Sequence, residues 1–341
     1  MQTTTSKQNG GRQGQPVPPV WPSYTGVSQY VGTTGTGRVT VYVDPSLGSE
    51  ALANARALLA DADRVVAAND RIFGTQGGPV NVIVFALDGE TDGSGGADHG
   101  GCDYTTGAAI EVCASYGQPE RVSALFEAEL SECSMNGNLC GESTGEALSR
   151  LCAAVVGNDA LSDFTTAPEW GRNGFPNFVD RTDQTDRNPI STGCGMAFLS
   201  WLRGKGYALE VIAPAMVSLG DAGTLAELYA KLTGDDAANA WDQFIAAVRA
   251  LPGGVVDDDP FRATAPLPRI GFTPWTAEVA GRVFGSIFAG LAAGKDDAAI
   301  LAGVRAVLRT SPASSRYTEG RSCVVRSHRL RASRSAAAAP R

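Results

Sequence analysis

The sequence has little histidine: only His99 and His328 occur among its 341 residues. A Ser-His-Asp triad needs an imidazole beside the nucleophile, and a two-histidine zinc site would have to bring both of these residues together. His99 lies in a Gly-rich stretch and His328 in a basic segment near the end of the sequence. Histidine-based catalysis is therefore not expected, and we interpret His99 as a loop residue.

Long apolar runs and a positive charge balance are also missing. No apolar run is long enough to cross a bilayer, and residues 1–22 have no apolar core like that of a signal peptide. The formal net charge of −8 disfavours a nucleic-acid partner for the folded part, because binding phosphates requires clustered Lys and Arg. We expect a soluble protein with no membrane partner, and the composition slightly favours the cytoplasm.

Nucleotide-binding loops and paired C-x-x-C motifs are absent as well, so neither a nucleotide cofactor nor a zinc ribbon is expected. Seven cysteines are present, and six of them lie between Cys102 and Cys194. Buried free thiols and three disulfides are both compatible with this spacing. If a single bridge forms, Cys102 with Cys113 is the pair that we expect.

What the sequence does contain is the pattern of an α+β protein. Alternating Val residues at 38–43 and apolar runs at 80–87 and 108–114 predict strands of a small N-terminal mixed sheet. Helical periodicity follows and predicts a mainly helical body. Helices are expected at 50–72, from Pro119 onward, and at 144–156, 192–203, 207–219, 224–233 and 235–250.

Composition changes divide the chain into five segments. We expect a disordered arm at 1–36, an α+β domain at 37–251 and a Pro- and Gly-containing linker at 252–272 that includes three consecutive aspartates. Apolar residues that recur every four positions then predict an αα-hairpin at 273–310. Residues 311–341 are rich in Arg, Ser and Ala and predict a disordered basic tail.

The helix that begins at Pro119 contains an acidic residue in an unexpected place. Glu129 is spaced with Val122, Phe126 and Cys133 so that it falls within their apolar stripe, whereas Glu127 should point to solvent. A buried carboxylate is costly unless it is paired, protonated or bound to a cation. A site role for Glu129 and a hydrogen-bonded core role are both open, while Glu132 flanks the stripe as a half-exposed charge.

The next predicted helix begins with Ser143-Thr144-Gly145-Glu146. This segment matches the S-x-x-E capping box, in which the glutamate accepts from the backbone of the cap residue. The alternative is that Glu146 contributes its carboxylate to a site shared with the preceding helix.

The segment Ala128-Glu129-Leu130-Ser131-Glu132 resembles the H-E-x-x-H helix of gluzincin metallopeptidases with both histidines replaced. In that family a glutamate from a following helix, in a pattern similar to G-E-x-L, is the third zinc ligand, and Glu146 has a comparable place. The resemblance covers about residues 38–251. It implies a zincin-like fold in which Glu129 keeps the position of the general base.

The resemblance does not imply zinc, because Ala128 has no donor atom. The remaining carboxylates of Glu129, Glu132 and Glu146 suit Ca²⁺ or Mg²⁺ better than Zn²⁺. Asp180 and Asp183 form a second acidic group, which follows Trp170 in the sequence, and could line a cleft for a cation or a carbohydrate. The alternative is an ordinary polar loop.

These patterns predict a catalytically degenerate, non-peptidase relative of the gluzincins. One alternative is a module that binds a peptide, a glycan or a small molecule without turnover. The other is a hydrolase that uses a carboxylate-bound cation, with Glu129 as the general base and Glu132 and Glu146 holding the cation or the substrate.

Overall fold

The computed structural model describes residues 16–104 and 109–262, with five single positions between 285 and 299. The chain divides into two compact units, Met1–Leu267 and Pro268–Arg341. Apart from those single positions, the hairpin predicted at 273–310 and the tail predicted at 311–341 lie outside the described residues. The fold described below belongs to the first unit.

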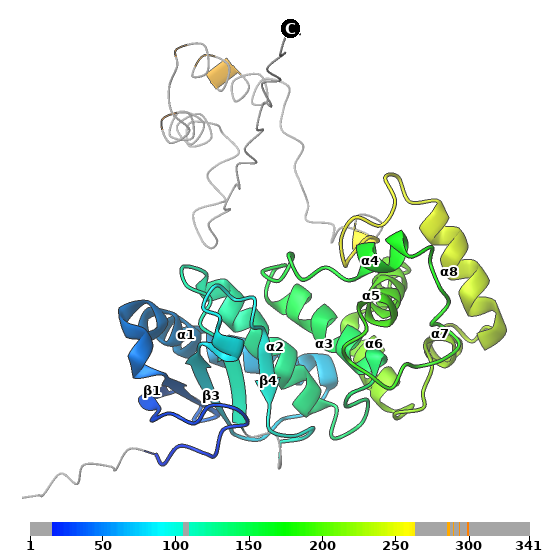
Figure 1. Cartoon of the computed structure of the whole chain (residues 1–341). Coiled ribbons are helices and arrows are strands. Elements are labelled where there is room, and N and C mark those ends of the chain that lie inside the picture. The colour runs from blue at the N-terminus through cyan, green and yellow to red at the C-terminus, as the bar shows by residue number, and fades with distance from the viewer. Residues whose placement is uncertain are drawn as a thin grey trace, which may run out of the picture. The chain divides into compact units, whose positions relative to one another are not determined.

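A five-stranded mixed sheet forms the N-terminal part of this unit (Figure 1). Its order is β1-β2-β3-β5-β4. The three inner strands are parallel, and the two outer strands are antiparallel to their neighbours. The strands are β1 (Gln29–Thr33), β2 (Val39–Val43), β3 (Val80–Phe85), β4 (Ala97–His99) and β5 (Ala109–Cys113).

Helices make up most of the described residues after β5, and one long helix lies between β2 and β3, which confirms the predicted α+β class. They are α1 (Gly48–Phe73), α2 (Pro119–Ser134), α3 (Ser143–Val156), α4 (Ala167–Arg172), α5 (Pro189–Gly204), α6 (Leu209–Val217), α7 (Leu225–Thr233) and α8 (Ala240–Arg249). The described residues also form three short 3₁₀ turns at Pro45–Leu47, Leu87–Gly89 and Ala237–Asn239. None of the described helices has the length and apolar character needed to span a membrane.

The two faces of the sheet are covered differently. Side chains alternate along a strand, so the aligned Val41 and Val82 lie on one face, where α1 and α2 pack. The register also aligns Tyr42, Ile83 and Glu111 with one another on the opposite face. That face is covered by the N-terminal segment, discussed next.

Part of the expected disordered arm is ordered. Residues 29–33 form β1, and Trp21 is buried with its ring 5.5 Å from that of Tyr42. The buried carboxylate of Glu111 accepts hydrogen bonds from the backbone of Ser23 and Tyr24, at 3.0 and 2.8 Å. The sequence of this arm is rich in Thr, Gln and Gly, and its few aromatic residues become anchors only when the sheet is present.

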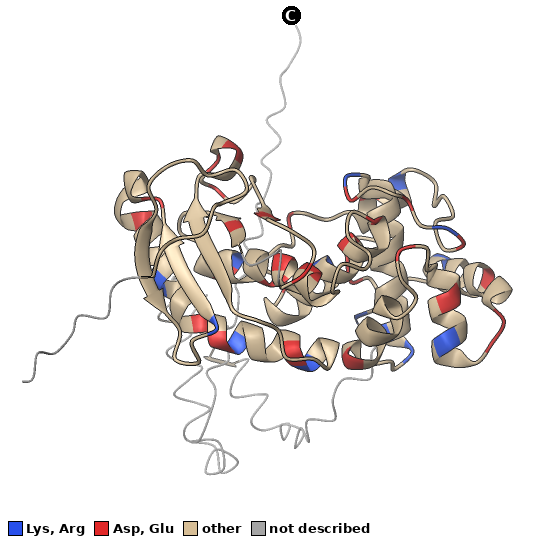
Figure 2. Ribbon diagram, turned by 90° about the horizontal axis from the view of Figure 1, so that it is seen from below, with Lys and Arg blue, Asp and Glu red and all other residues tan. Residues whose placement is uncertain are grey.

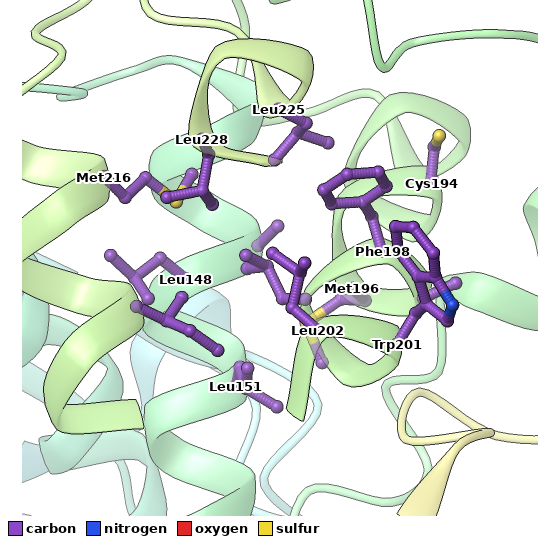
Figure 3. Packing of buried hydrophobic residues seen from close by; sticks show 14 of the residues in the cluster. Leu148, Leu151, Cys194, Met196, Phe198, Trp201, Leu202, Met216, Leu225 and Leu228 are labelled. Carbon is purple, nitrogen blue, oxygen red and sulfur yellow. The ribbon is translucent and has the colours of Figure 1, made fainter. Parts of the chain in front are cut away.

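A second core lies within the helical body and is separate from the core of the sheet. In Figure 3, Leu148 and Leu151 of α3 lie near Leu202 of α5, and Phe198 lies beside Trp201. Both aromatic residues are almost fully buried. This core fixes α3 against α5 and thereby holds the first turns of α3 in place.

The beginning of the expected linker packs on this body. Asp258 accepts from the backbone N–H groups of Thr166 and Ala167, at 2.7 and 2.6 Å, where α4 begins. Asp259 is buried and accepts from the Ser200 hydroxyl at 2.5 Å, and Phe261 is buried as well. The aspartates of this segment therefore stabilise helices, although in the sequence they have the composition of a linker.

Candidate functional site

The structure brings together His99 from strand β4 with Glu129 and Glu132 from helix α2. The imidazole Nε2 of His99 lies 2.9 Å from a carboxylate oxygen of Glu132 and 3.8 Å from one of Glu129. The three side chains are only 11%, 12% and 17% exposed, in the order His99, Glu129, Glu132. One donor atom from each can be chosen so that all three lie within 4.8 Å of one another.

The interpretation of His99 as a loop residue is wrong. Residues 97–99 form an edge strand that pairs antiparallel with β5, and this pairing carries His99 over α2. A three-residue strand in a Gly- and Asp-rich segment has no period in the sequence, so pattern analysis could not find it. The one available signal was the scarcity of histidine itself.

A disulfide fastens the segment that follows His99. Cys102 is bonded to Cys140, which lies in the connection between α2 and α3, and the N–H of Gly137 donates to the carbonyl of Cys102 at 2.6 Å. The expected Cys102–Cys113 bridge is wrong. Cys113 is buried at the end of β5, where its thiol donates to the Glu90 carbonyl at 3.2 Å.

Glu132 is held at both of its oxygens. One accepts from the Ser149 hydroxyl of α3 at 3.1 Å, and the other pairs with His99. Burial of the His99 imidazole lowers its pKa, but the hydrogen bond and charge of Glu132, together with the Gly101 backbone and the charge of Asp98, outweigh burial, so the net pKa of His99 is raised. Glu132 is thus fixed by partners on two other elements, instead of being the half-exposed charge that we expected.

Glu129 has no comparable support. Its carboxylate makes no hydrogen bond within the described part of the chain, and its contact with His99 at 3.8 Å is a long ion pair. Desolvation by burial, followed by repulsion from Glu132, Glu146 and Asp98, raises the pKa of Glu129 well above its ordinary value. Its carboxylate is thus set up to hold a proton or to meet a cation.

Glu146 does not form the predicted capping box. The cap residue of α3 is Glu142, and no side chain caps this end of the helix. The carboxylate of Glu146 instead accepts from the guanidinium of Arg150, one turn further along α3. Burial raises the pKa of Glu146 to about 7 in spite of the Arg150 charge.

These groups line a cleft of about 570 Å³. Its walls come from the β3–β4 connection and from α2, α3 and the segments 157–166, 186–196 and 257–262. Figure 2 shows acidic segments gathered in the middle of this unit, between its sheet and its helices. Ten carboxylate side chains and three arginines line the cleft, so it is strongly acidic; the acids are Asp88, Asp98, Glu129, Glu132, Glu146, Asp159, Asp186, Asp257, Asp258 and Asp259.

Glu127 was expected to point to solvent, and that expectation is wrong. Its side chain is fully buried, with one oxygen accepting from Asn69 of α1 at 3.2 Å and from Ser131 at 3.3 Å. Burial raises the pKa of Glu127 to about 8. The reason is that α2 is covered by α1 and the sheet on one side and by α3 on another, so a single apolar stripe does not describe it.

Asp180 and Asp183 are not brought to this site. Asp180 is exposed and accepts from Asn177 at 2.5 Å, and Asp183 accepts from Asn188 and Ser191 near the start of α5. Neither belongs to the residues that line the cleft, whereas Asp186 does. Trp170 does not line the cleft either, because its ring is buried and stacked on Phe244.

The residues present do not fit a gluzincin-type zinc ion. Such a site needs imidazoles at the positions of Ala128 and Glu132, and the methyl group of Ala128 cannot coordinate a metal. His99 enters from a different element and takes neither of these helical positions. Comparison with family models, curated proteins and solved structures finds no match to this chain.

Proposed function

We propose that this protein is a catalytically degenerate relative of the gluzincin peptidases that uses its acidic cleft to bind a positively charged ligand. The observation that supports the proposal most directly is the lining of the cleft, with ten carboxylates against three arginines. Such an excess of one sign attracts ligands of the other sign and repels acidic ones. A cleft of about 570 Å³ has room for several side chains of an extended peptide.

A separate observation supports the absence of zinc-peptidase activity. A zinc peptidase needs the metal to polarise the scissile carbonyl and to activate water, and the histidine positions that would hold it are Ala128 and Glu132. Glu129 remains at the place of the general base. Without a zinc ion held by histidines at those two helical positions, Glu129 lacks the activated water that the general base of a gluzincin deprotonates.

Glu129 supports a second candidate function, a hydrolase with a carboxylate as the proton-transfer group. Its carboxylate faces the cleft without a hydrogen bond in the described part of the chain, and its pKa is raised by burial. A carboxylate with a pKa near the working pH can both accept and donate a proton. If such an activity is found, Glu129→Gln should abolish it.

The binding proposal is tested with two short peptides, tetralysine and tetraglutamate, titrated calorimetrically in the presence of EDTA. We expect tetralysine to bind, to bind more weakly as salt is raised, and tetraglutamate not to bind. The double variant Glu129→Gln with Glu132→Gln should weaken binding of tetralysine. A control that removes two exposed acids elsewhere, Glu50→Gln with Asp242→Asn, should leave it unchanged.

The loss of peptidase activity is tested with a library of quenched fluorescent peptides in the presence of added Zn²⁺. No hydrolysis above that of the buffer is expected. Hydrolysis that a chelator stops and that Glu129→Gln abolishes would contradict the proposal. Equal binding of both charged peptides, or of neither, would contradict the assignment of a cationic ligand.

A further inference from the structure

We infer that His99, Glu129 and Glu132 form a binding site for a divalent first-row transition-metal ion of the Zn²⁺ or Mn²⁺ class. The inference rests on the proposed cation-binding role of the cleft and names an ion for its deepest part. It differs from a gluzincin site because its imidazole comes from edge strand β4 and not from the helix. Its carboxylates sit at the helical positions of the general base and of the second histidine.

The donor atoms already lie close together. His99 Nε2 is 2.9 Å from Glu132 and 3.8 Å from Glu129, and a donor from each residue fits within a span of 4.8 Å. Metal–ligand bonds to nitrogen and oxygen are about 2.0–2.2 Å, so donors around one ion are separated by roughly 3–4 Å. Small side-chain rotations would replace the His99–Glu132 hydrogen bond by coordination of a shared ion.

The chemistry of the donors selects the kind of ion. Imidazole nitrogen suits Zn²⁺ and Fe²⁺, and carboxylate oxygen also suits Mn²⁺, whereas Ca²⁺ and Mg²⁺ prefer oxygen ligands alone. The all-carboxylate set expected from the sequence favoured Ca²⁺ or Mg²⁺, and the addition of His99 shifts that preference. Three protein ligands leave coordination positions for water or for a ligand in the cleft.

The surroundings also favour a bound cation. Glu129 has carboxylates of Glu132, Glu146 and Asp98 around it and no hydrogen bond in the described part of the chain, so a positive ion would remove a repulsion that the protein otherwise retains. The second oxygen of Glu132 is oriented by Ser149 at 3.1 Å. Partners of this kind, which orient a ligand from behind, typically change metal affinity about 10- to 100-fold.

The position of His99 is fixed from outside the site. The Cys102–Cys140 disulfide and the bond from the Gly137 N–H to the Cys102 carbonyl tie the segment after β4 to the end of α2. A histidine that is tied to the helix it faces loses less conformational freedom when an ion binds. Metal binding is therefore best measured with the disulfide intact and without reducing agents.

The test is a titration of the metal-free, oxidised protein with Zn²⁺, Mn²⁺ and Ca²⁺, followed by calorimetry and by the melting temperature. We expect one equivalent of Zn²⁺ or Mn²⁺ to bind and to raise the melting temperature, while the same concentration of Ca²⁺ has little effect. His99→Ala, Glu129→Ala and Glu132→Ala should each weaken binding at least about tenfold. His328→Ala, which removes the only other histidine, should bind like the wild type.

Because the chain has two histidines, imidazole NMR gives a readout that does not depend on variants that fold poorly. Adding Zn²⁺ to the wild type should shift the signals of one imidazole and leave the other in place. The shifted signals should be those that are missing in His99→Ala, or those that remain in His328→Ala. Shifts of both imidazoles or of neither would overturn the inference.

Two further outcomes would overturn it. One is a wild-type protein that binds no transition ion, and the other is a protein that binds Ca²⁺ as tightly as Zn²⁺ and Mn²⁺ whether or not His99 is present. The peptide titration of the proposed function is done in EDTA and this titration is done without peptide. Failure of one is therefore distinguishable from failure of the other.

Discussion

At the scale of single residues, helix α2 holds three glutamates in three different environments. Glu127 is fully buried against Asn69 of α1, Glu129 faces the cleft without a hydrogen bond in the described part of the chain, and Glu132 is held by His99 and Ser149. Helical spacing in the sequence gives only the direction, or angle, in which each of these side chains leaves the helix axis. What lies at each angle is decided by α1, β4 and α3.

Glu127→Gln should flatten the dependence of stability on pH. An acid whose pKa rises on folding, here from 4.5 to about 8, contributes stability below its unfolded pKa and loses it as pH rises through the folded pKa. The wild type should therefore lose on the order of a few kcal/mol of unfolding free energy between these two pH values. The amide of Gln cannot ionise, so the variant should keep that stability.

The measurement is urea unfolding of both proteins at several pH values from 5 to about 9. Glu132→Gln serves as a comparison from the same helix, because its carboxylate is partnered by a histidine and a hydroxyl. If the unfolding free energies of the wild type and of Glu127→Gln change with pH in parallel, Glu127 does not titrate in this range.

Glu129→Leu should stabilise the metal-free protein. The substitution removes a largely buried carboxylate that is repelled by Glu132 and Glu146 and replaces it with an apolar side chain. Stabilisation of about 1–2 kcal/mol at neutral pH is typical when a functional group is exchanged for a structurally better one. Glu132→Leu should act in the opposite direction, because it removes the partner of the largely buried His99 imidazole and one of the two acceptors of the Ser149 hydroxyl.

Thermal and chemical unfolding in EDTA measure both variants. If Glu129→Leu lowers the melting temperature by as much as Glu132→Leu does, Glu129 has a structural role and not a site role.

At the scale of elements, the short edge strand β4 and its attachment decide whether the site exists. The strand has three residues, and the backbone of His99 reaches α2 only because β4 pairs with β5 and the following segment is bonded to the α2–α3 connection. Each of these links is a contact between segments distant in the sequence.

Cys102→Ser should destabilise the protein and weaken Zn²⁺ binding. The bridge closes a loop between residues that are 38 apart, and bridges of this span typically contribute about 2–4 kcal/mol by restricting the unfolded chain. Cys140→Ser should have the same effect, since either change breaks the same bond. Both are measured by denaturant unfolding under oxidising conditions.

Cys113→Ser tests whether Cys102 is bonded to Cys140, as in the structure, or to Cys113, as we expected from the sequence. Cys113 is a free, buried thiol, so its replacement should leave the Cys102–Cys140 peptide intact in mass spectrometry without reduction. A peptide that joins Cys102 to Cys113 in the wild type would contradict the structure.

Thr224→Ala should destabilise the helical body through the end of α7. The Thr224 hydroxyl accepts from the N–H of Glu227 at 3.1 Å, and the Glu227 carboxylate accepts from the N–H of Thr224 at 2.8 Å, which completes a capping box. Loss of a Thr cap typically costs about 1 kcal/mol. Thr224→Ser keeps the hydroxyl and should cost much less when both are compared by urea unfolding.

At the scale of the first unit of the chain, two cores are joined through the helices that carry the site. One core combines the sheet with α1 and α2, and the other contains α3 to α8. Glu129 and Glu132 belong to α2, and Glu146, Ser149 and Arg150 belong to α3. The cleft therefore depends on both cores being folded.

A chain that ends at residue 251 should be less stable than one that ends at residue 267. The segment lost between them contains Asp258, which binds two N–H groups where α4 begins, and Asp259 and Phe261, which are buried. Losing these contacts should cost several kcal/mol, on the order of 3–5, comparable with large core deletions. The longer chain keeps all of them and ends at the boundary between the two units.

Melting temperatures of the two chains and of the full protein give the comparison. The chain 1–267 should melt close to the full protein. Equal melting of 1–251 and 1–267 would mean that residues 252–262 do not support the helical body.

The sequence by itself determined the α+β class, the three inner strands and most of the helices. These elements have long apolar runs or sustained helical periods, and such patterns are local properties of the chain. Helical spacing also placed Glu129 within an apolar stripe, and the resemblance to the gluzincin helices added Glu132 and Glu146 as candidate site carboxylates.

Tertiary structure alone decided the remaining features. Strand β4, the buried state of Glu127, the Cys102–Cys140 pairing and the position of His99 depend on contacts between segments that are not neighbours in the sequence. Strand β1 pairs with the next strand along the chain, β2, and its polar sequence gave no strand pattern. A short strand or a covered helix face has no period of its own, and its burial is set by whatever packs against it. For this reason the acidic residues of the site could be predicted from the sequence, and the histidine that completes it could not.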